Sequence, residues 1–414
     1  MRLGTHRLRV LRHARFRRFL LGQTTSLLGS GMNTIATTFA VLRLPGGGVD
    51  AVGGVMAARI VAVLVVLLLG GVFTDRLGAR TVMLAADVLR FGSQAVLALL
   101  LLTGSVRIWE VVVLAMLLGV GEGGFMPGLS ALVPGLVPLE ELADANALLA
   151  MARPLASIVG PALAGVLVAA FDAGTVVAVD AVSYGVSVVA LVGMPEVRAQ
   201  TSGRGLSGEL GQGWREFTSR TWLWVTTLHI GLFNFFLWAP FLVLGPAIAE
   251  RRLGGASAWG LVLASEGVGA IVGGVLLLGR SPRRGLAWSV AASAGWAAPV
   301  AALATRLPLT WVVGAAFLAG IGAAVCTTLA ATVIQRDVPA EVRGRISAFD
   351  SLGAFALGPL GLALAGPVSG VVGVGRLLGF GVLWQVTAVG VVLAVPSVRR
   401  HEATPRVDAR VGAH

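Results

Sequence analysis

Residues 51–103 read AVGGVMAARIVAVLVVLLLGGVFTDRLGARTVMLAADVLRFGSQAVLALLLLT. Two apolar runs, 51–73 and 82–103, flank a short charged connection. A helix needs about 20 apolar residues to cross the hydrocarbon core of a bilayer. The stretch therefore predicts two membrane-spanning helices joined by a tight loop at one membrane face.

The composition extends this prediction to the whole chain of 414 residues. Hydrophobic residues make up 56% of the chain, not counting 57 glycines, and charged residues make up 13%, against about 25% in soluble domains. Such a chain has too few polar residues to cover a surface that faces water. A soluble enzyme is excluded on this ground, and the single cysteine permits neither an internal disulfide nor a thiolate metal cluster.

Twelve apolar stretches have the length of a membrane span, so we expect an all-α membrane protein with twelve transmembrane helices. The first follows a strongly basic segment, but its length indicates a retained helix rather than a signal peptide. The predicted spans are 20–43, 51–73, 82–103, 108–130, 146–170, 174–194, 222–246, 257–279, 286–305, 309–334, 346–368 and 373–395.

All 32 basic residues are arginines, and their distribution predicts the orientation in the membrane. With both termini in the cytoplasm, 23 arginines lie on the cytoplasmic side and six on the other, as the positive-inside rule requires. We expect a multi-pass protein of the cell membrane that acts as a monomer. The arginines lie between apolar runs rather than on one folded basic face, so we expect no nucleic-acid partner.

The chain divides into two similar halves. The polar stretch 195–221 is interpreted as a cytoplasmic linker between six-helix bundles at 1–194 and 222–396, with a tail at 397–414. Pro138, Glu140, Gly160 and Gly165 recur 201 positions later as Pro339, Glu341, Gly361 and Gly366. The matches predict an internal repeat, hence two bundles related by a pseudo-twofold axis, which is a transporter architecture.

The connection between the second and third spans carries the most specific motif. It contains Gly71, Asp75, Arg76, Gly78 and Arg80, and it resembles the loop Gly-x-x-x-Asp-Arg-x-Gly-x-Arg of the major facilitator superfamily. The resemblance implies a loop that latches the two halves on the cytoplasmic side. The matching place in the second half keeps the glycines and arginines and lacks the aspartate, which favours one latch over two.

Other segments resemble the twelve-helix efflux branch of that superfamily, which includes macrolide-efflux and enterobactin-exporter-like proteins. They are residues 131–146, 158–165 and 339–345. The pair Gly160 and Pro161 is similar to a motif that the family associates with antiporters, in a shortened form. The alternative for this pair is a packing kink, because proline removes a helix hydrogen bond.

Acids inside the predicted spans need a reason, since a charge at mid-bilayer costs about 2.5–3.5 kcal/mol on insertion scales. We interpret Asp87, Asp180 and Asp350 as structurally paired acids. Glu122, among glycines of span four, and Glu266, in the middle of span eight, are candidates for proton coupling or cargo binding, and hydrogen-bonded structural acids are the alternative. Further cavity candidates are Asn33 and Asn234, which are 201 positions apart, and Trp238.

The sequence contains no nucleotide-binding loop, metal-ligand cluster or catalytic triad, so we expect no enzyme activity, no metal and no cofactor. The function that these observations favour is secondary active transport, namely proton-coupled export of an amphipathic small molecule such as a drug, antibiotic or siderophore. A same-fold importer or lysophospholipid flippase is the first alternative. A membrane receptor or structural protein without turnover is the second.

Overall fold

The computed structural model describes residues 9–196, 211, 214–280 and 282–401, without the side chains of 68–73, 75, 130, 340–341 and 344–345. These residues form helices and no strand. The first half contains η1 (Arg9–Arg12), α2 (Ala14–Arg43), α3 (Val49–Leu77), α4 (Ala79–Leu102), α5 (Ile108–Leu132), η2 (Val133–Gly135), η3 (Leu139–Glu141), α6 (Leu142–Ala170) and α7 (Ala173–Leu191).

The second half repeats six membrane-length segments, three of which change helix type or break on the way. They are α9 (Thr221–Phe233) with η4 (Asn234–Trp238), α10 (Ala239–Ile248) and η5 (Ala249–Leu253); α11 (Gly255–Leu276); α12 (Gly285–Ser293) with η6 (Ala294–Trp296) and α13 (Ala297–Ala304); α14 (Leu309–Asp337); α15 (Ala340–Phe355) with α16 (Gly358–Val372); and α17 (Val374–Ala394), followed by the short α18 (Pro396–Arg399).

Each predicted span coincides with one of these helical segments. Among the described residues, eleven segments are long and apolar enough to cross a membrane. The twelfth, α2, has the length but not the hydropathy, because it carries polar side chains along much of its course. Several of these, including Gln23, Ser26 and Asn33, are buried where α2 packs against α6 and α7. Its polar residues thus face the protein, and α2 completes the set of twelve.

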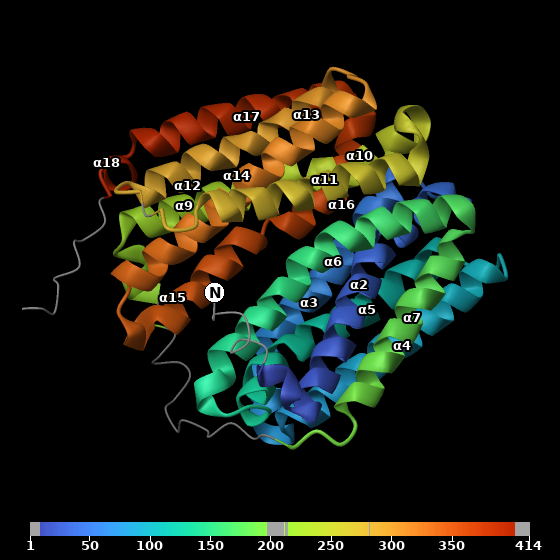
Figure 1. Cartoon of the computed structure of the whole chain (residues 1–414). Helices are drawn as coiled ribbons and strands as arrows, with labels where there is room; N and C mark the ends of the chain where they lie inside the picture. Colours follow the sequence, from blue (N-terminus) through green and yellow to red (C-terminus); the bar gives the residue numbers. More distant parts are fainter. Residues whose placement is uncertain (1–8, 197–210, 212–213, 281, 402–414) are drawn as a thin grey trace, which may run out of the picture.

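The helices form two bundles that lie side by side (Figure 1). In the first, α2 packs on α6 and α7, and α5 packs on α3 and α4; in the second, α14 packs on α11 and α12, and α13 packs on α17. The bundles contact each other mainly through two helix pairs, α6 with α11 and α3 with α16. The pairs are related by the predicted repeat, since they join the fifth span to the eighth and the eleventh to the second.

Backbone geometry agrees with the repeat. Gly78, between α3 and α4, has φ +88°, and Gly279, 201 positions later, has φ +70°. Gly104 and Arg306, at the ends of the third and ninth spans, also have φ of +68° and +62°. A positive φ thus recurs at corresponding turns of the two halves, as the predicted repeat implies.

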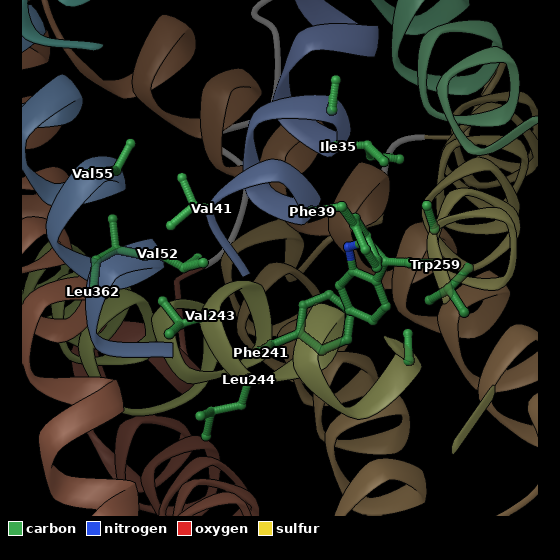
Figure 2. Close-up of a cluster of buried hydrophobic side chains, with 14 of the residues drawn as sticks. Ile35, Phe39, Val41, Val52, Val55, Phe241, Val243, Leu244, Trp259 and Leu362 are labelled. Atoms are coloured by element: carbon green, nitrogen blue, oxygen red, sulfur yellow. The ribbon is translucent and has the colours of Figure 1, made fainter. Parts of the chain in front are cut away.

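A hydrophobic cluster joins the two bundles at one end of the molecule. Figure 2 shows Phe39 of α2 beside Trp259 of α11 and Phe241 of α10, and the rings of Phe241 and Trp259 are 5.0 Å apart between centroids. Val52 of α3 and Leu362 of α16 belong to the same cluster. We call this end, where α2 ends and α3 begins, the far end. The opposite end, where α7 ends and α9 begins, is the linker end.

Toward the linker end the bundles diverge. The face of α6 that contacts α11 at Ile158 continues to Leu155 and Met151, whose side chains are 49% and 68% exposed. The facing side of α11 continues to Ile271 and Val275, which are 46% and 59% exposed. Since these residues lie one and two turns beyond the contact on the same helix faces, the bundles meet over the far half of their length.

Candidate functional site

Glycines allow the two bundles to touch at the backbone. A Cβ atom on Gly260 of α11 would lie 2.5 Å from the carbonyl oxygen of Pro161 in α6, and one on Gly165 of α6 would lie 2.9 Å from the carbonyl oxygen of Ala256. The same packing occurs at the repeat-related contact, where Gly366 of α16 faces Asp50 of α3. Small residues at such crossings permit close approach of membrane helices.

The predicted antiporter-like pair lies at this crossing. Gly160 contacts α2, because a Cβ there would lie 2.9 Å from the Cα of Gly31. Its neighbour Pro161 contacts Gly260 of the other bundle. The pair therefore sits between a helix of its own bundle and one of the opposite bundle. A packing role is evident from these contacts, and a gating role stays a prediction.

An ion pair connects the bundles at the far end. The guanidinium of Arg43, at the end of α2, donates to both carboxylate oxygens of Glu250 in η5, at 2.8 and 3.2 Å. The side chains are 52% and 31% exposed, so the pair adds little to stability. The pair nevertheless links α2 of the first bundle to η5 of the second at the closed end.

Glu122, predicted as a coupling or cargo-binding acid, is paired within the first bundle. Both of its carboxylate oxygens accept hydrogen bonds from the guanidinium of Arg59 in α3, one of them from Nε at 3.1 Å. Each side chain is 23% exposed. A bidentate pair of this kind is among the stronger polar contacts in proteins. The sequence analysis did not assign Arg59 as the partner of Glu122.

A second ion pair lies deeper in the same bundle. Asp87, predicted as a structurally paired acid, pairs with Arg90 of α4 and also accepts a hydrogen bond of 2.6 Å from Ser187 of α7. The guanidinium of Arg90 lies over the rings of Phe125 and Tyr184, 4.4 and 4.6 Å from their centroids. Cation–π contacts of this kind stabilise a desolvated arginine.

Asp180 of α7 is the third acid of this bundle, and its surroundings differ from the prediction. We expected a structurally paired acid, whereas Asp180, in the middle third of α7, has no ion-pair partner among the described residues. The side chain is fully buried, and Oδ2 has no hydrogen bond.

A narrow cavity of about 40 Å³ lies beside Arg59 within the first bundle. Its walls include Asn33, Thr37 and Gln94, and the side-chain oxygen of Gln94 is buried without a partner. Asn33 accepts a hydrogen bond of 2.8 Å from Thr37. The volume holds about three waters at 10–15 Å³ each, so Asn33 lines a small polar cavity inside the first bundle.

In the second bundle the predicted site residues make contacts of different kinds. The amide of Asn234 donates to the carbonyl oxygen of Ala354 at 2.8 Å, one turn before the break between α15 and α16. Trp238 packs half-buried against the hydrophobic cluster at the far end. Glu266 is half-buried beside Gly267, which contacts Ile158 of the other bundle, and no hydrogen bond or ion pair of its carboxylate occurs among the described residues.

Hydrogen-bonded polar groups also occupy the interior of this second bundle. His229 hydrogen-bonds through Nε2 to Ser293 at 3.1 Å, and the amide of Gln385 donates to the same serine. Asp350 accepts a hydrogen bond from Thr227. A cavity of about 100 Å³ adjoins His229 and Asp350.

The latch loop is described only in part. The surroundings of Gly71 and the side chain of Asp75 lie outside the described part of the structure, and Arg76 is exposed at the end of α3. Gly78 ends α3 with a positive φ of +88°, and a Cβ there would lie 2.1 Å from a carboxylate oxygen of Glu196. Glu196 accepts hydrogen bonds from the backbone N–H of Arg80 and the hydroxyl of Thr81, at 3.1 and 3.0 Å.

Glu196 thus caps the first turn of α4 and connects the loop to the end of the first bundle. A negative charge at the N-terminus of a helix also interacts favourably with the helix dipole. The sequence analysis missed this residue. An acid just after span six was the available signal, but only the fold brings it to the loop.

Two repeated bundles that meet at one end, with ion pairs and polar cavities in their membrane interior, define a membrane transport protein. The model of the Major Facilitator Superfamily matches residues 19–362. The chain therefore belongs to the Major Facilitator Superfamily, whose members are transporters rather than enzymes.

Two characterised relatives are efflux proteins. The chain is 28% identical to the multidrug efflux pump Tap of Mycolicibacterium fortuitum, over 86% of this chain and 89% of that protein. It is 24% identical to macrolide efflux protein A of Streptococcus pyogenes, over 62% of this chain and 64% of that protein.

The solved structures that resemble the chain include a crystal structure of the nucleoside transporter NupG (D323A mutant). The TM-score is 0.73 with 11% identity, and the match covers 92% of this chain and 99% of that one. At this identity the likeness concerns the fold alone.

Proposed function

We propose that the protein exports amphipathic small molecules from the cytoplasm by proton-coupled alternating access. The observation that carries the proposal is the combination of a closed far end with buried acids and arginines at mid-membrane. With the linker end facing the cytoplasm, as the arginine distribution predicts, the bundles are open toward the cytoplasm. Such a conformation accepts cargo from the side on which an exporter must load it, and the efflux functions of the two relatives support the same direction.

Coupling requires a group that binds a proton in one conformation and releases it in the other. The driving force is available, because one proton that crosses 100 mV releases about 2.3 kcal/mol. Acids in the membrane interior are the natural carriers, and the first bundle holds three of them. The half-buried Glu266, next to the contact between bundles and without a described partner, is our candidate for recognition of cationic cargo.

Everted membrane vesicles test the proposal directly, because their lumen corresponds to the outside of the cell. We expect vesicles that contain the protein to accumulate a fluorescent amphipathic cation and a macrolide when the lumen is acidified, and to lose them when a protonophore is added. Vesicles without the protein are the control. Accumulation in right-side-out vesicles instead would indicate an importer, and equal accumulation with and without a pH gradient would contradict proton coupling.

Replacement of the two glutamates separates their roles. We expect Glu266→Gln to weaken transport of cations and to spare neutral cargo. Glu122→Gln should impair pH-driven export for every cargo, because Glu122 forms an ion pair with Arg59 in the interior of the first bundle. Wild-type behaviour of both variants would assign both acids to structure alone.

A further inference from the structure

We propose that the first bundle holds one exchangeable proton and that this proton resides on Asp180. Proton binding as such follows from the packing of the bundle. Its role in coupling rests on the proposed function.

The carboxylate of Asp180 lacks the donors that a buried charge needs. Its side chain is 0% exposed, and Oδ2 has no hydrogen bond. The nearest donor is the hydroxyl of Ser183, which lies 2.7 Å from the backbone oxygen of Asp180 and 3.4 Å from Oδ1. A hydroxyl has one proton, and the shorter contact uses it. On the α2 side the neighbour is Gly29, where a Cβ would lie 2.5 Å from Oδ1, so α2 offers no donor at this point.

The charged groups around Asp180 come from three other helices. Arg59 of α3, Glu122 of α5 and Arg90 of α4 act on it electrostatically. Asp87 of α4 is held by Arg90 and Ser187. The hydroxyl of Tyr184, on the same helix as Asp180, is 2.8 Å from the hydroxyl of Ser30 in α2.

The charges of this cluster do not balance. Its two arginines face three acids, and each arginine has an acid of its own: Arg59 has both oxygens of Glu122, and Arg90 has Asp87. Asp180 is the acid that remains. An uncompensated charge in a water-excluded interior is strongly unfavourable, and a single proton on Asp180 makes the cluster neutral. The protonated carboxyl also has fewer unmet hydrogen-bonding requirements than the carboxylate.

Release of the proton would change what the arginines must neutralise. Arg59 is one of the two cations of the cluster, so an ionised Asp180 competes with Glu122 for it. Arg59 lies six residues after Gly53, and Gly53 contacts the carbonyl oxygen of Leu362 in the other bundle. A shift of α3 toward α7 would disturb this contact, so the proton is placed to bias the closure of the far end.

Infrared spectroscopy of the protein reconstituted in lipid reports protonated carboxyl groups without any cargo. We expect the wild type to show the C=O band of a protonated carboxyl at neutral pH. The band should shift when the protein is made with aspartate that carries ¹³C in its side-chain carboxyl, which identifies an aspartate without any substitution. Asp180→Asn should lose the band, and Asp172→Asn, the same change on an exposed residue at the start of α7, should keep it.

Absence of the band in the wild type, lack of a shift on aspartate labelling, or an unchanged band in Asp180→Asn would each overturn the proposal. If Asp180→Asn fails to fold, the labelling experiment and Asp180→Glu still decide, since the glutamate variant should keep a protonated band that aspartate labelling no longer shifts. Transport is measured separately. Asp180→Asn should exchange cargo without a gradient but not respond to pH. If the wild type moves no cargo, the proposed function fails while the infrared result stands.

Discussion

The two bundles share a fold but differ in how they treat polar groups in the membrane interior. In the first, two arginines pair with Glu122 and Asp87, and a third acid lies beside them. In the second, within the described membrane helices, the acids Asp350 and Glu266 have no cationic partner, and His229, Ser293 and Gln385 form a neutral network. The chain path of the repeat is kept while the charges are not, so the chain path does not by itself require these charges.

The largest effect should follow from removal of the arginine that neutralises Glu122. We expect Arg59→Gln to lower the free energy of unfolding by about 3 kcal/mol, because it leaves a partly buried carboxylate without its partner. Glu266→Gln, in the second bundle, should change it by less than about 1 kcal/mol, since no pair is broken. Thermal unfolding in detergent measures both.

The double variant Arg59→Gln with Glu122→Gln is the control for this comparison. It should regain most of the lost stability, because no unpaired charge remains. If the double variant is no more stable than Arg59→Gln, the ion pair does not stabilise the first bundle.

The contact between the bundles should be the next most sensitive place. Gly260→Val should reduce transport by about tenfold or more, which corresponds to about 1.4 kcal/mol, because the added side chain collides with the backbone at Pro161. Gly370→Val is the matched control, as a Cβ at Gly370 meets nothing within 4 Å. Equal transport by the two variants would show that the far end need not close this tightly.

Replacement of the two asparagines related by the repeat should lower stability to different degrees, because their side chains make different contacts. Asn234→Ala should cost about 1–2 kcal/mol, since it leaves a carbonyl near a helix break without its donor. Asn33→Ala should cost about 0.5 kcal/mol, because Thr37 on the same helix can bond to a backbone carbonyl instead. Comparison of the two unfolding temperatures tests this, and the reverse order would contradict the assigned roles.

The smallest effect concerns the left-handed turns. Arg306→Gly should raise the stability by about 1 kcal/mol, because a residue other than glycine pays a steric penalty there. Gly104→Arg, at the corresponding turn of the first bundle, should lower it by a similar amount. Loss of stability in Arg306→Gly would mean that the side chain of Arg306 makes a contact that outweighs the penalty.

The sequence predicted the fold better than the site. The apolar runs are local features of the sequence, and they predicted the spans. The match of Gly160 to Gly361 is a periodic feature, and it predicted the repeat. The pairing of Glu122 with Arg59 joins residues that are 63 positions apart on two helices, and no pattern in either helix points to the other. Tyr184, the one tyrosine of the chain, was an available hint that span six faces a polar interior.

The seventh span contains two π-helical segments, η4 and η5, whereas its counterpart α2 is a continuous α-helix. A π turn holds one residue more than an α turn, which rotates everything beyond it by about 100° relative to an uninterrupted helix. Asn33 and Asn234 are related by an offset of 201 positions. Beyond Trp238, residues related by the same offset therefore lie on different faces of the two helices. A chimera that exchanges the far ends of these two helices would need one residue added or deleted at Asn234–Trp238 to keep its apolar side inward.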